Sequence, residues 1–203
     1  MAGVFEKIRA TNLWGSADSV SGLGSELDST ARVRAELPGL LREMGVRTML
    51  DIPCGDFHWL SQVDLPIDRY IGADIVESVV RTNPECPGRE FVKLDLCRDP
   101  LPKVDLVLCR DCLVHLSLEA VEEAVHNLKA SGSEWLLTTH FLECTANVDI
   151  DTGDWRMLNF QLAPFHWPAP HTVIVEGCDE SGGGYDDKVL ALWSLAELLR
   201  ASK

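Results

Sequence analysis

Basic residues are scarce in this chain of 203 residues, which has 18 Lys and Arg against 32 Asp and Glu and a net charge of −14. Proteins that bind nucleic acids use Lys and Arg to neutralise phosphates, and anionic membrane surfaces attract clusters of the same residues. The composition therefore predicts no nucleic-acid partner and no membrane partner. It favours a neutral or cationic small molecule, free or attached to a carrier, and sets no oligomeric state.

Long apolar runs are also missing, although 46% of the residues are hydrophobic. A membrane-spanning helix needs roughly 20 consecutive apolar residues, and a secretory leader needs a basic start before an apolar stretch. Residues 1–7 (MAGVFEK) have neither feature. We expect a soluble, cytoplasmic protein in which residues 1–203 form a single domain, because this length suffices for one full core.

A second closely spaced cysteine pair is missing as well. Among the seven cysteines, only Cys109 and Cys112 have the two-residue spacing of redox and zinc-binding pairs. A structural zinc site needs four ligands, which commonly come from two such pairs. The odd number of thiols and the expected cytoplasmic location indicate reduced cysteines that pack as small hydrophobic residues. We therefore predict no metal site.

Three short apolar segments each end in an acid. They are residues 47–51 (RTMLD), 70–74 (YIGAD) and 91–95 (FVKLD), which end in Asp51, Asp74 and Asp95. A fourth apolar segment, residues 104–109, follows them. In an open α/β sheet, ligands bind at the carboxyl ends of the strands, so these acids are expected to converge on one crevice that holds a nucleoside. For any one acid alone, the alternative is a cap for the following helix.

The acids suit different parts of a nucleoside. A carboxylate at the end of the second strand, Asp74, can accept hydrogen bonds from both ribose hydroxyls. Asp95, at the end of the third, can accept one from the exocyclic amine of adenine. Gly55, in the turn after the first strand, lets the backbone approach the ligand closely because glycine has no Cβ.

These segments resemble the class I S-adenosylmethionine-dependent methyltransferases over about residues 45–140. Residues 51–57 (DIPCGDF) match the family's glycine-rich first motif, of which only the middle glycine is present, and residues 104–116 (VDLVLCRDCLVHL) resemble its fourth motif. The resemblance implies an α/β fold with a doubly wound, mostly parallel, seven-stranded Rossmann-like sheet and a C-terminal antiparallel hairpin. It implies S-adenosylmethionine as the cofactor, bound by Trp14, Asp51, Pro53, Cys54, Gly55, Asp56, Asp74, Ile75, Asp95, Leu96 and Arg110.

A nicotinamide-binding enzyme is the competing interpretation, since it also joins a strand, a turn and a ribose acid. Its fingerprint, G-x-G-x-x-G, needs glycines for the turn, for the approach of the pyrophosphate and for helix packing. Here Gly55 is followed by Asp56, whose charge repels a pyrophosphate. Asp51 and Asp56 suit a sulfonium amino acid better.

Regular patterning divides the domain into four parts. Residues 1–45 are expected to form a lid and a helix from Asp28 or Ser29 to about Met44, bent or divided at Pro38. Residues 46–143 form the cofactor-binding core, with a helix capped by Ser117 and a fifth strand at 135–141. Residues 144–170 are irregular and aromatic, as acceptor-binding loops often are. Residues 171–203 hold the last two strands and a helix.

Three further segments, residues 12–15, 21–25 and 153–159, resemble a narrower group of small bacterial methyltransferases that act on saccharides or specialised metabolites. Under this interpretation Trp14 covers the cofactor, while four residues bound the acceptor pocket: Trp155, Arg156, Asn159 and His166. The alternative is that Trp14 and Trp155 are ordinary packing aromatics.

An oxygen acceptor must lose a proton during methyl transfer, and histidine is the usual base at neutral pH. His140 ends the fifth strand and His115 begins the element after the fourth, so both are predicted to face the crevice. Asp111 can orient the base or bind the acceptor. The sequence favours O-methylation of a small molecule, with N-methylation and a non-catalytic cofactor-binding scaffold as alternatives.

Overall fold

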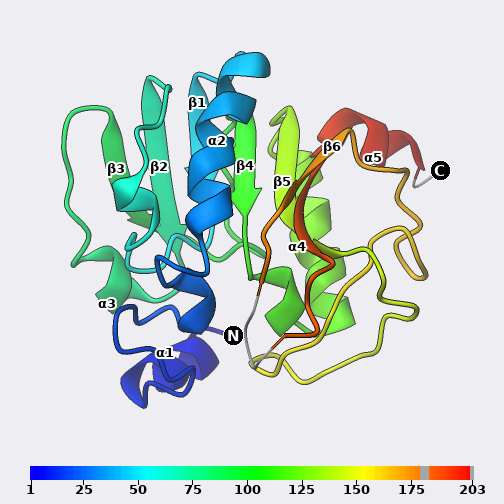
Figure 1. The fold of residues 1–203 in the computed structure, drawn as a ribbon, viewed down its shortest axis with the longest axis horizontal. Helices are drawn as coiled ribbons and strands as arrows, with labels where there is room; N and C mark the ends of the chain where they lie inside the picture. Colours follow the sequence, from blue (N-terminus) through cyan, green and yellow to red (C-terminus); the bar gives the residue numbers. More distant parts are fainter. Residues whose placement is uncertain (179–182, 202–203) are drawn as a thin grey trace.

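The computed structural model describes residues 1–178 and 183–201. Seven strands form a single sheet in the order β3, β2, β1, β4, β5, β7, β6 (Figure 1). The strands are β1 (Thr48–Asp51), β2 (Arg69–Asp74), β3 (Arg89–Lys93), β4 (Leu106–Cys109), β5 (Trp135–Phe141), β6 (Thr172–Val175) and β7 (Lys188–Ser194). The first five run parallel, and β7 lies antiparallel between β5 and β6. The protein has the doubly wound α/β, Rossmann-like fold, and the predicted C-terminal antiparallel pair is confirmed.

Helices cover both faces of the sheet, with α2 in front of it and α4 behind it in Figure 1. The helices are α1 (Ala2–Ala10), α2 (Ala31–Glu43), α3 (Glu77–Val80), α4 (Leu118–Ala130) and α5 (Leu195–Ala201). Three short 3-10 turns are η1 (Leu23–Ser25), η2 (Leu60–Gln62) and η3 (Leu113–His115). In β1, Met49 and Leu50 are fully buried in opposite cores, as expected for a strand covered on both faces.

One of the two helix caps predicted from the sequence is confirmed. α2 begins at Ala31 with Thr30 at its N-cap, and that side chain makes no capping hydrogen bond, so the predicted cap at Asp28 or Ser29 was wrong. The Ser117 side chain accepts a hydrogen bond from the Ala120 N–H at 3.3 Å, which confirms the predicted cap of α4. Pro38 lies inside α2 and does not divide it. Leu37 and Leu41 on the same helix are completely buried, so tertiary packing compensates for the backbone hydrogen bond that proline removes.

The strand order reverses between β1 and β4, since the chain passes from β1 outward through β2 and β3 before it crosses to β4. Such a reversal opens a crevice at the carboxyl ends of the strands. In Figure 1 these ends point toward α1 and the irregular segment 142–171, so both lie at the same edge of the sheet.

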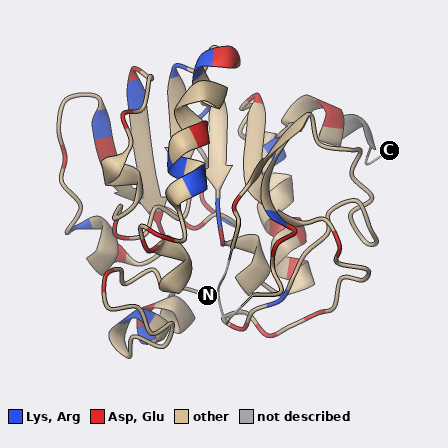
Figure 2. Cartoon of the chain, viewed as in Figure 1, with Lys and Arg blue, Asp and Glu red and all other residues tan. Residues whose placement is uncertain are grey.

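Acidic and basic residues are interspersed along the described chain (Figure 2). Among the described residues, no helix is both long and apolar enough to cross a membrane. Within the same residues, no group of three or more His, Cys, Asp or Glu is arranged to hold a metal ion.

Candidate functional site

The turn after β1 is fastened to both neighbouring strands. The Ile52 N–H donates to the Leu108 carbonyl at 2.9 Å, and the Cys54 N–H donates to the Ala73 carbonyl at 2.8 Å. Gly55 follows with a φ of +52°, and its N–H donates to the Asp74 carboxylate at 3.2 Å. The turn and the acid that ends β2 therefore form one rigid wall of the crevice.

The crevice contains an open cavity, here called the first cavity, whose free space of about 1080 Å³ includes space open to solvent. Ten of the eleven predicted cofactor residues line it: Trp14, Asp51, Pro53, Cys54, Gly55, Asp56, Asp74, Ile75, Leu96 and Arg110. The apolar side chains of Val76, Val79 and Leu94 also line it. The first cavity thus combines carboxylates at the strand ends with an apolar side wall.

Asp95 is the exception among these predictions. Its two neighbours Leu94 and Leu96 line the first cavity, but Asp95 is not among the lining residues. One of its carboxylate oxygens accepts from the Cys97 N–H at 2.9 Å. The placement of Asp95 in the crevice was wrong, because its carboxylate caps the turn after β3, which is the alternative that applies to any single strand-end acid.

The two remaining strand-end acids are buried and electrostatically unusual. Asp51 accepts a hydrogen bond of 2.6 Å from the Tyr70 hydroxyl, and burial raises the pKa of Asp51 to about 7. Burial raises the pKa of Asp74 to about 6, although the N–H groups of Val76 and Gly55 stabilise its charge. A positive charge or hydroxyl donors bound beside these carboxylates would favour their ionised forms.

Asp56 lines the first cavity, but its carboxylate holds the N-terminal segment. It accepts from the Ser19 hydroxyl and the Val20 N–H, both at 2.9 Å, and from the Ser21 hydroxyl at 3.3 Å. Gly22 has a φ of +93°, and a Cβ there would lie 2.8 Å from the Cβ of Trp14. These contacts fix Trp14 and residues 19–22 over the crevice.

A second cavity adjoins the first, and its free space of about 840 Å³ also includes space open to solvent. Trp14, Ser21, Asp111 and His115 line both cavities. The other lining residues of the second cavity are Gly22, Leu23, Gly24, Phe141, Trp155, Cys178, Tyr185 and Lys188. Two spaces that share a wall of this kind can hold two ligands next to each other.

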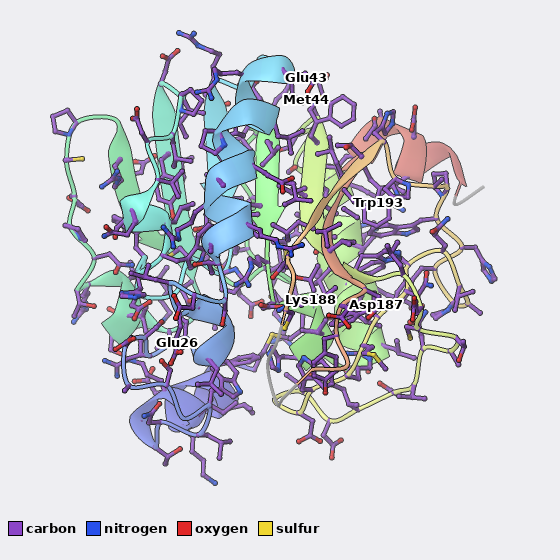
Figure 3. The ribbon with its side chains drawn as sticks, in the orientation of Figure 1. Glu26, Glu43, Met44, Asp187, Lys188 and Trp193 are labelled. Carbon is purple, nitrogen blue, oxygen red and sulfur yellow. The ribbon has the colours of Figure 1, made fainter. Side chains whose placement is uncertain are left out.

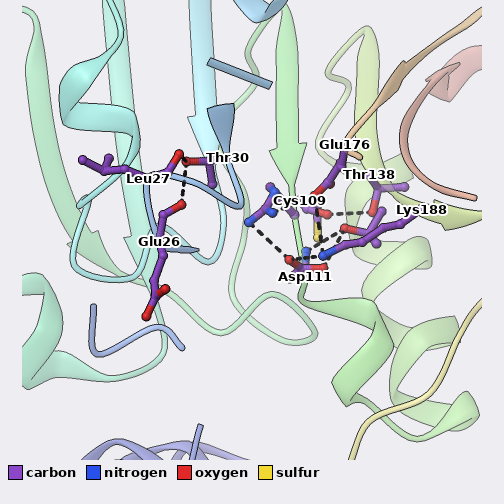
Figure 4. A network of polar contacts seen from close by, with 10 residues as sticks. Glu26, Leu27, Thr30, Cys109, Asp111, Thr138, Glu176 and Lys188 are labelled. Carbon is purple, nitrogen blue, oxygen red and sulfur yellow. Dashed lines mark hydrogen bonds and ion pairs between the residues drawn. The ribbon is translucent and has the colours of Figure 1, made fainter. Parts of the chain in front are cut away.

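Four charged side chains form a buried network where the cavities meet (Figure 4). Asp111 lies 2.9 Å from the Lys188 amine and 3.2 Å from the Arg110 guanidinium, and Glu176 lies 2.7 Å from Arg110. Lys188 begins β7 in Figure 3. Although burial acts to raise it, Lys188 and Arg110 hold the pKa of Asp111 well below its usual range.

His115 stands between the two cavities with one ring nitrogen engaged. Its Nδ1 lies 2.8 Å from the Asp154 carbonyl oxygen. Because a carbonyl can only accept, Nδ1 carries the hydrogen and Nε2 has the basic lone pair. The ring packs on Trp14 at 5.0 Å, and burial lowers the pKa of His115, so the imidazole is neutral at pH 7.

His140 does not reach the crevice, so its predicted placement was wrong. The side chain is fully buried between Phe160 and Trp193, with ring-centre distances of 6.2 and 5.3 Å, and it lines neither cavity. Its Nδ1 accepts from the Phe160 N–H at 3.2 Å, and burial lowers the pKa of His140 to about 4. The irregular segment folds back over β5 and covers this histidine.

Only one of the four predicted acceptor residues, Trp155, lines the second cavity. Arg156 is buried and donates to the Val114 carbonyl at 3.1 Å, so it supports the turn that carries His115. Asn159 is buried and donates to the Cys144 carbonyl at 3.0 Å. His166 is exposed and lines neither cavity. The predicted placements of these last three residues at the pocket were wrong, because Arg156 supports the turn at Val114, Asn159 stabilises the irregular segment itself and His166 faces solvent.

Glu176 and Lys188 belong to the site but were not predicted from the sequence. Glu176 directly follows β6, and Lys188 begins β7. A charged residue at the end of an apolar strand was the sequence feature that could have identified them. Their partners Arg110 and Asp111 lie 66 and 77 residues away along the chain. Only the antiparallel pairing of β6 with β7 and of β7 with β5 brings these charges together.

No protein-family model and no curated protein matches this chain. Among solved structures, it is similar to the methyltransferase domain of bacterial CtHen1-C, with 14% identity, a TM-score of 0.49, and 57% of this chain and 66% of that one covered. It is also similar to magnesium protoporphyrin IX methyltransferase from Synechocystis PCC 6803, solved with S-adenosylhomocysteine, with 16% identity and a TM-score of 0.46. That match covers 68% of this chain and 67% of the other. A third similar structure is an amino pentose methyltransferase from Micromonospora echinaspora, solved with S-adenosylmethionine, with 18% identity and a TM-score of 0.48. That match covers 57% of this chain and 53% of the other.

The chain spans about two thirds or less of the length of these three structures. All three are methyltransferases, and the likeness is one of fold.

Proposed function

We propose that this protein transfers a methyl group from S-adenosylmethionine to a hydroxyl group of a small molecule. The observation that carries the proposal is His115, whose basic Nε2 belongs to a side chain shared by two adjoining cavities. One cavity suits a nucleoside with a charged amino-acid end, and the other suits an acceptor.

The first cavity fits the cofactor in its chemistry. Asp74 would accept hydrogen bonds from the ribose hydroxyls, and the apolar side chains of Leu94 and Leu96 would contact the adenine. Asp51 would attract the ammonium group, since Asp56 is already engaged by the N-terminal segment. A dinucleotide fits less well because the turn has one glycine and two acids at the place where a pyrophosphate would bind.

S-adenosylmethionine, when bound, supplies a methyl group on a positively charged sulfur. Nε2 of His115 would accept the proton of the acceptor hydroxyl, whose oxygen would take the methyl group as the bond from that carbon to sulfur broke. Asp111 accepts a hydrogen bond from the acceptor and orients it. Trp14 and the segment that Asp56 holds exclude water from both ligands.

A cavity with aromatic side chains beside the proposed methyl position favours an enzyme over a non-catalytic scaffold. A neutral imidazole at that wall favours a hydroxyl acceptor over an amine, because the hydroxyl has the greater need for a base. We place the acceptor among specialised metabolites or saccharides.

A structure with S-adenosylhomocysteine tests the proposal. We expect the ribose hydroxyls within hydrogen-bond distance of Asp74 and the sulfur on the side of His115. Density elsewhere on the molecule, or a sulfur that faces away from His115, would contradict the proposed reaction.

A further inference from the structure

Five of the twelve residues that line the second cavity carry aromatic rings: Trp14, His115, Phe141, Trp155 and Tyr185. Phe141, Trp155 and Tyr185 meet edge to face, with ring centres 5.9, 5.2 and 6.2 Å apart. Trp14 and His115 form a second aromatic pair at 5.0 Å, with their rings inclined by 35°. Trp155 is 42% exposed, so a large indole surface is open to a ligand. Surfaces of this kind bind flat rings by stacking and edge contacts.

The polar groups of the second cavity lie close together. Asp111 and Lys188 are paired at 2.9 Å, and Asp111 also lines the wall shared with His115. The Ser21 hydroxyl already donates to Asp56. Among the described residues, the network contains two cations, Arg110 and Lys188, and two anions, Asp111 and Glu176, whose charges offset one another. The cavity therefore suits an uncharged ligand with its polar group at one end.

A saccharide suits these walls poorly. It has hydroxyls around its whole ring, and each would need a hydrogen-bond partner when buried. A ring with one hydroxyl needs polar partners at a single point. An aromatic hydroxyl is also the easier proton donor, since a phenol has a pKa of about 10. This value lies closer to the pKa of histidine than the pKa of an alcohol does.

We propose that the second cavity binds a planar, uncharged aromatic ring that carries a hydroxyl group. The ring lies against Trp155, and the hydroxyl is directed to His115 and Asp111. This inference rests on the proposed function and narrows its acceptor class to phenolic compounds. Trp155 is the residue that selects the ring.

Binding of two probes to the protein saturated with S-adenosylhomocysteine tests the inference. The probes are 2-naphthol, as a flat phenolic ring, and methyl α-glucopyranoside, as a saccharide, with affinity measured by calorimetry or by ligand-observed NMR. We expect 2-naphthol to bind at least about 10-fold more tightly than the glucoside, because only the flat ring can use the aromatic walls.

Three variants locate the probe. Trp155→Ala is expected to weaken 2-naphthol binding by about 10-fold, and Trp155→Phe is expected to retain most of the affinity because it keeps an aromatic face. Met157→Ala serves as the control, since Met157 lies on the same segment with 37% exposure and lines neither cavity. The affinity for S-adenosylhomocysteine is measured on every sample, so the state of the first cavity is known.

The outcomes separate the two proposals. Equal or tighter binding of the glucoside by the S-adenosylhomocysteine complex overturns the phenolic class and leaves the methyltransferase proposal standing. Unchanged 2-naphthol affinity in folded Trp155→Ala overturns the assigned position. Failure of the wild-type protein to bind S-adenosylhomocysteine overturns the proposed function together with the inference built on it.

Discussion

Replacing His115 with Gln is expected to lower turnover by about 10²- to 10⁴-fold, which is the usual contribution of a general base. Glutamine can still donate to the Asp154 carbonyl that now receives the Nδ1 hydrogen, so the local fold should survive. Affinity for S-adenosylhomocysteine should stay nearly unchanged, because the base acts only in the transition state. Steady-state kinetics with a phenolic acceptor and calorimetry with S-adenosylhomocysteine measure the two effects separately.

The pH profile adds a second readout for the same variant. Burial lowers the pKa of His115 below 6.5, so the imidazole stays neutral and active until the pH falls below that value. Wild-type turnover should therefore fall on the acid side below pH 6.5, and this limb should disappear in His115→Gln. His126→Gln, an exposed histidine of α4, is the matched control. Full turnover with an unchanged profile in His115→Gln would mean that alignment alone or Asp111 suffices.

Replacing Asp74 with Ala is expected to weaken S-adenosylhomocysteine binding by about 5- to 150-fold, which corresponds to about 1 to 3 kcal/mol for hydrogen bonds to a buried charge. Asp95→Ala is the matched control, because Asp95 follows β3 closely but lies outside the first cavity. Its affinity should change little. An unaltered affinity in folded Asp74→Ala would show that this acid only fastens the turn at Gly55.

The binding should also depend on pH, in a direction set by the same acid. The pKa of Asp74 is about 6 in the free protein, so the carboxylate is protonated as the pH falls through that value. Protonation removes acceptor capacity for the ribose hydroxyls. Affinity for S-adenosylhomocysteine should therefore decline between pH 7 and pH 5 in the wild-type protein, and the decline should be weaker in Asp74→Ala.

The sequence predicted the fold and the crevice well because both depend on local patterns. Short apolar strands, the Ser117 cap and the acids at the ends of β1 and β2 are each visible within a few residues. The rule that ligands bind at carboxyl strand ends then placed Asp51 and Asp74 at one cavity. Asp95 shows the limit of that rule, since one local hydrogen bond to Cys97 turns its carboxylate to a cap.

The acceptor side was less predictable because it depends on contacts distant in sequence. Segment 142–171 contains no helix or strand, so no periodicity indicates which of its side chains face inward. Arg156 was expected to contact the acceptor, yet it supports the backbone that carries His115. His140 lies one residue before the end of β5, and Phe160 and Trp193 cover it. These outcomes follow from packing that a single sequence does not show.

Isothermal titration of the wild-type protein with S-adenosylhomocysteine and with NAD shows which nucleoside the first cavity accepts. We expect S-adenosylhomocysteine to bind at one site per chain and at least about 100-fold more tightly than NAD, a difference of roughly 2.7 kcal/mol. The single glycine of the turn and the acids Asp51 and Asp56 are the physical reason. Equal or tighter binding of NAD, or no measurable binding of S-adenosylhomocysteine, would contradict this expectation.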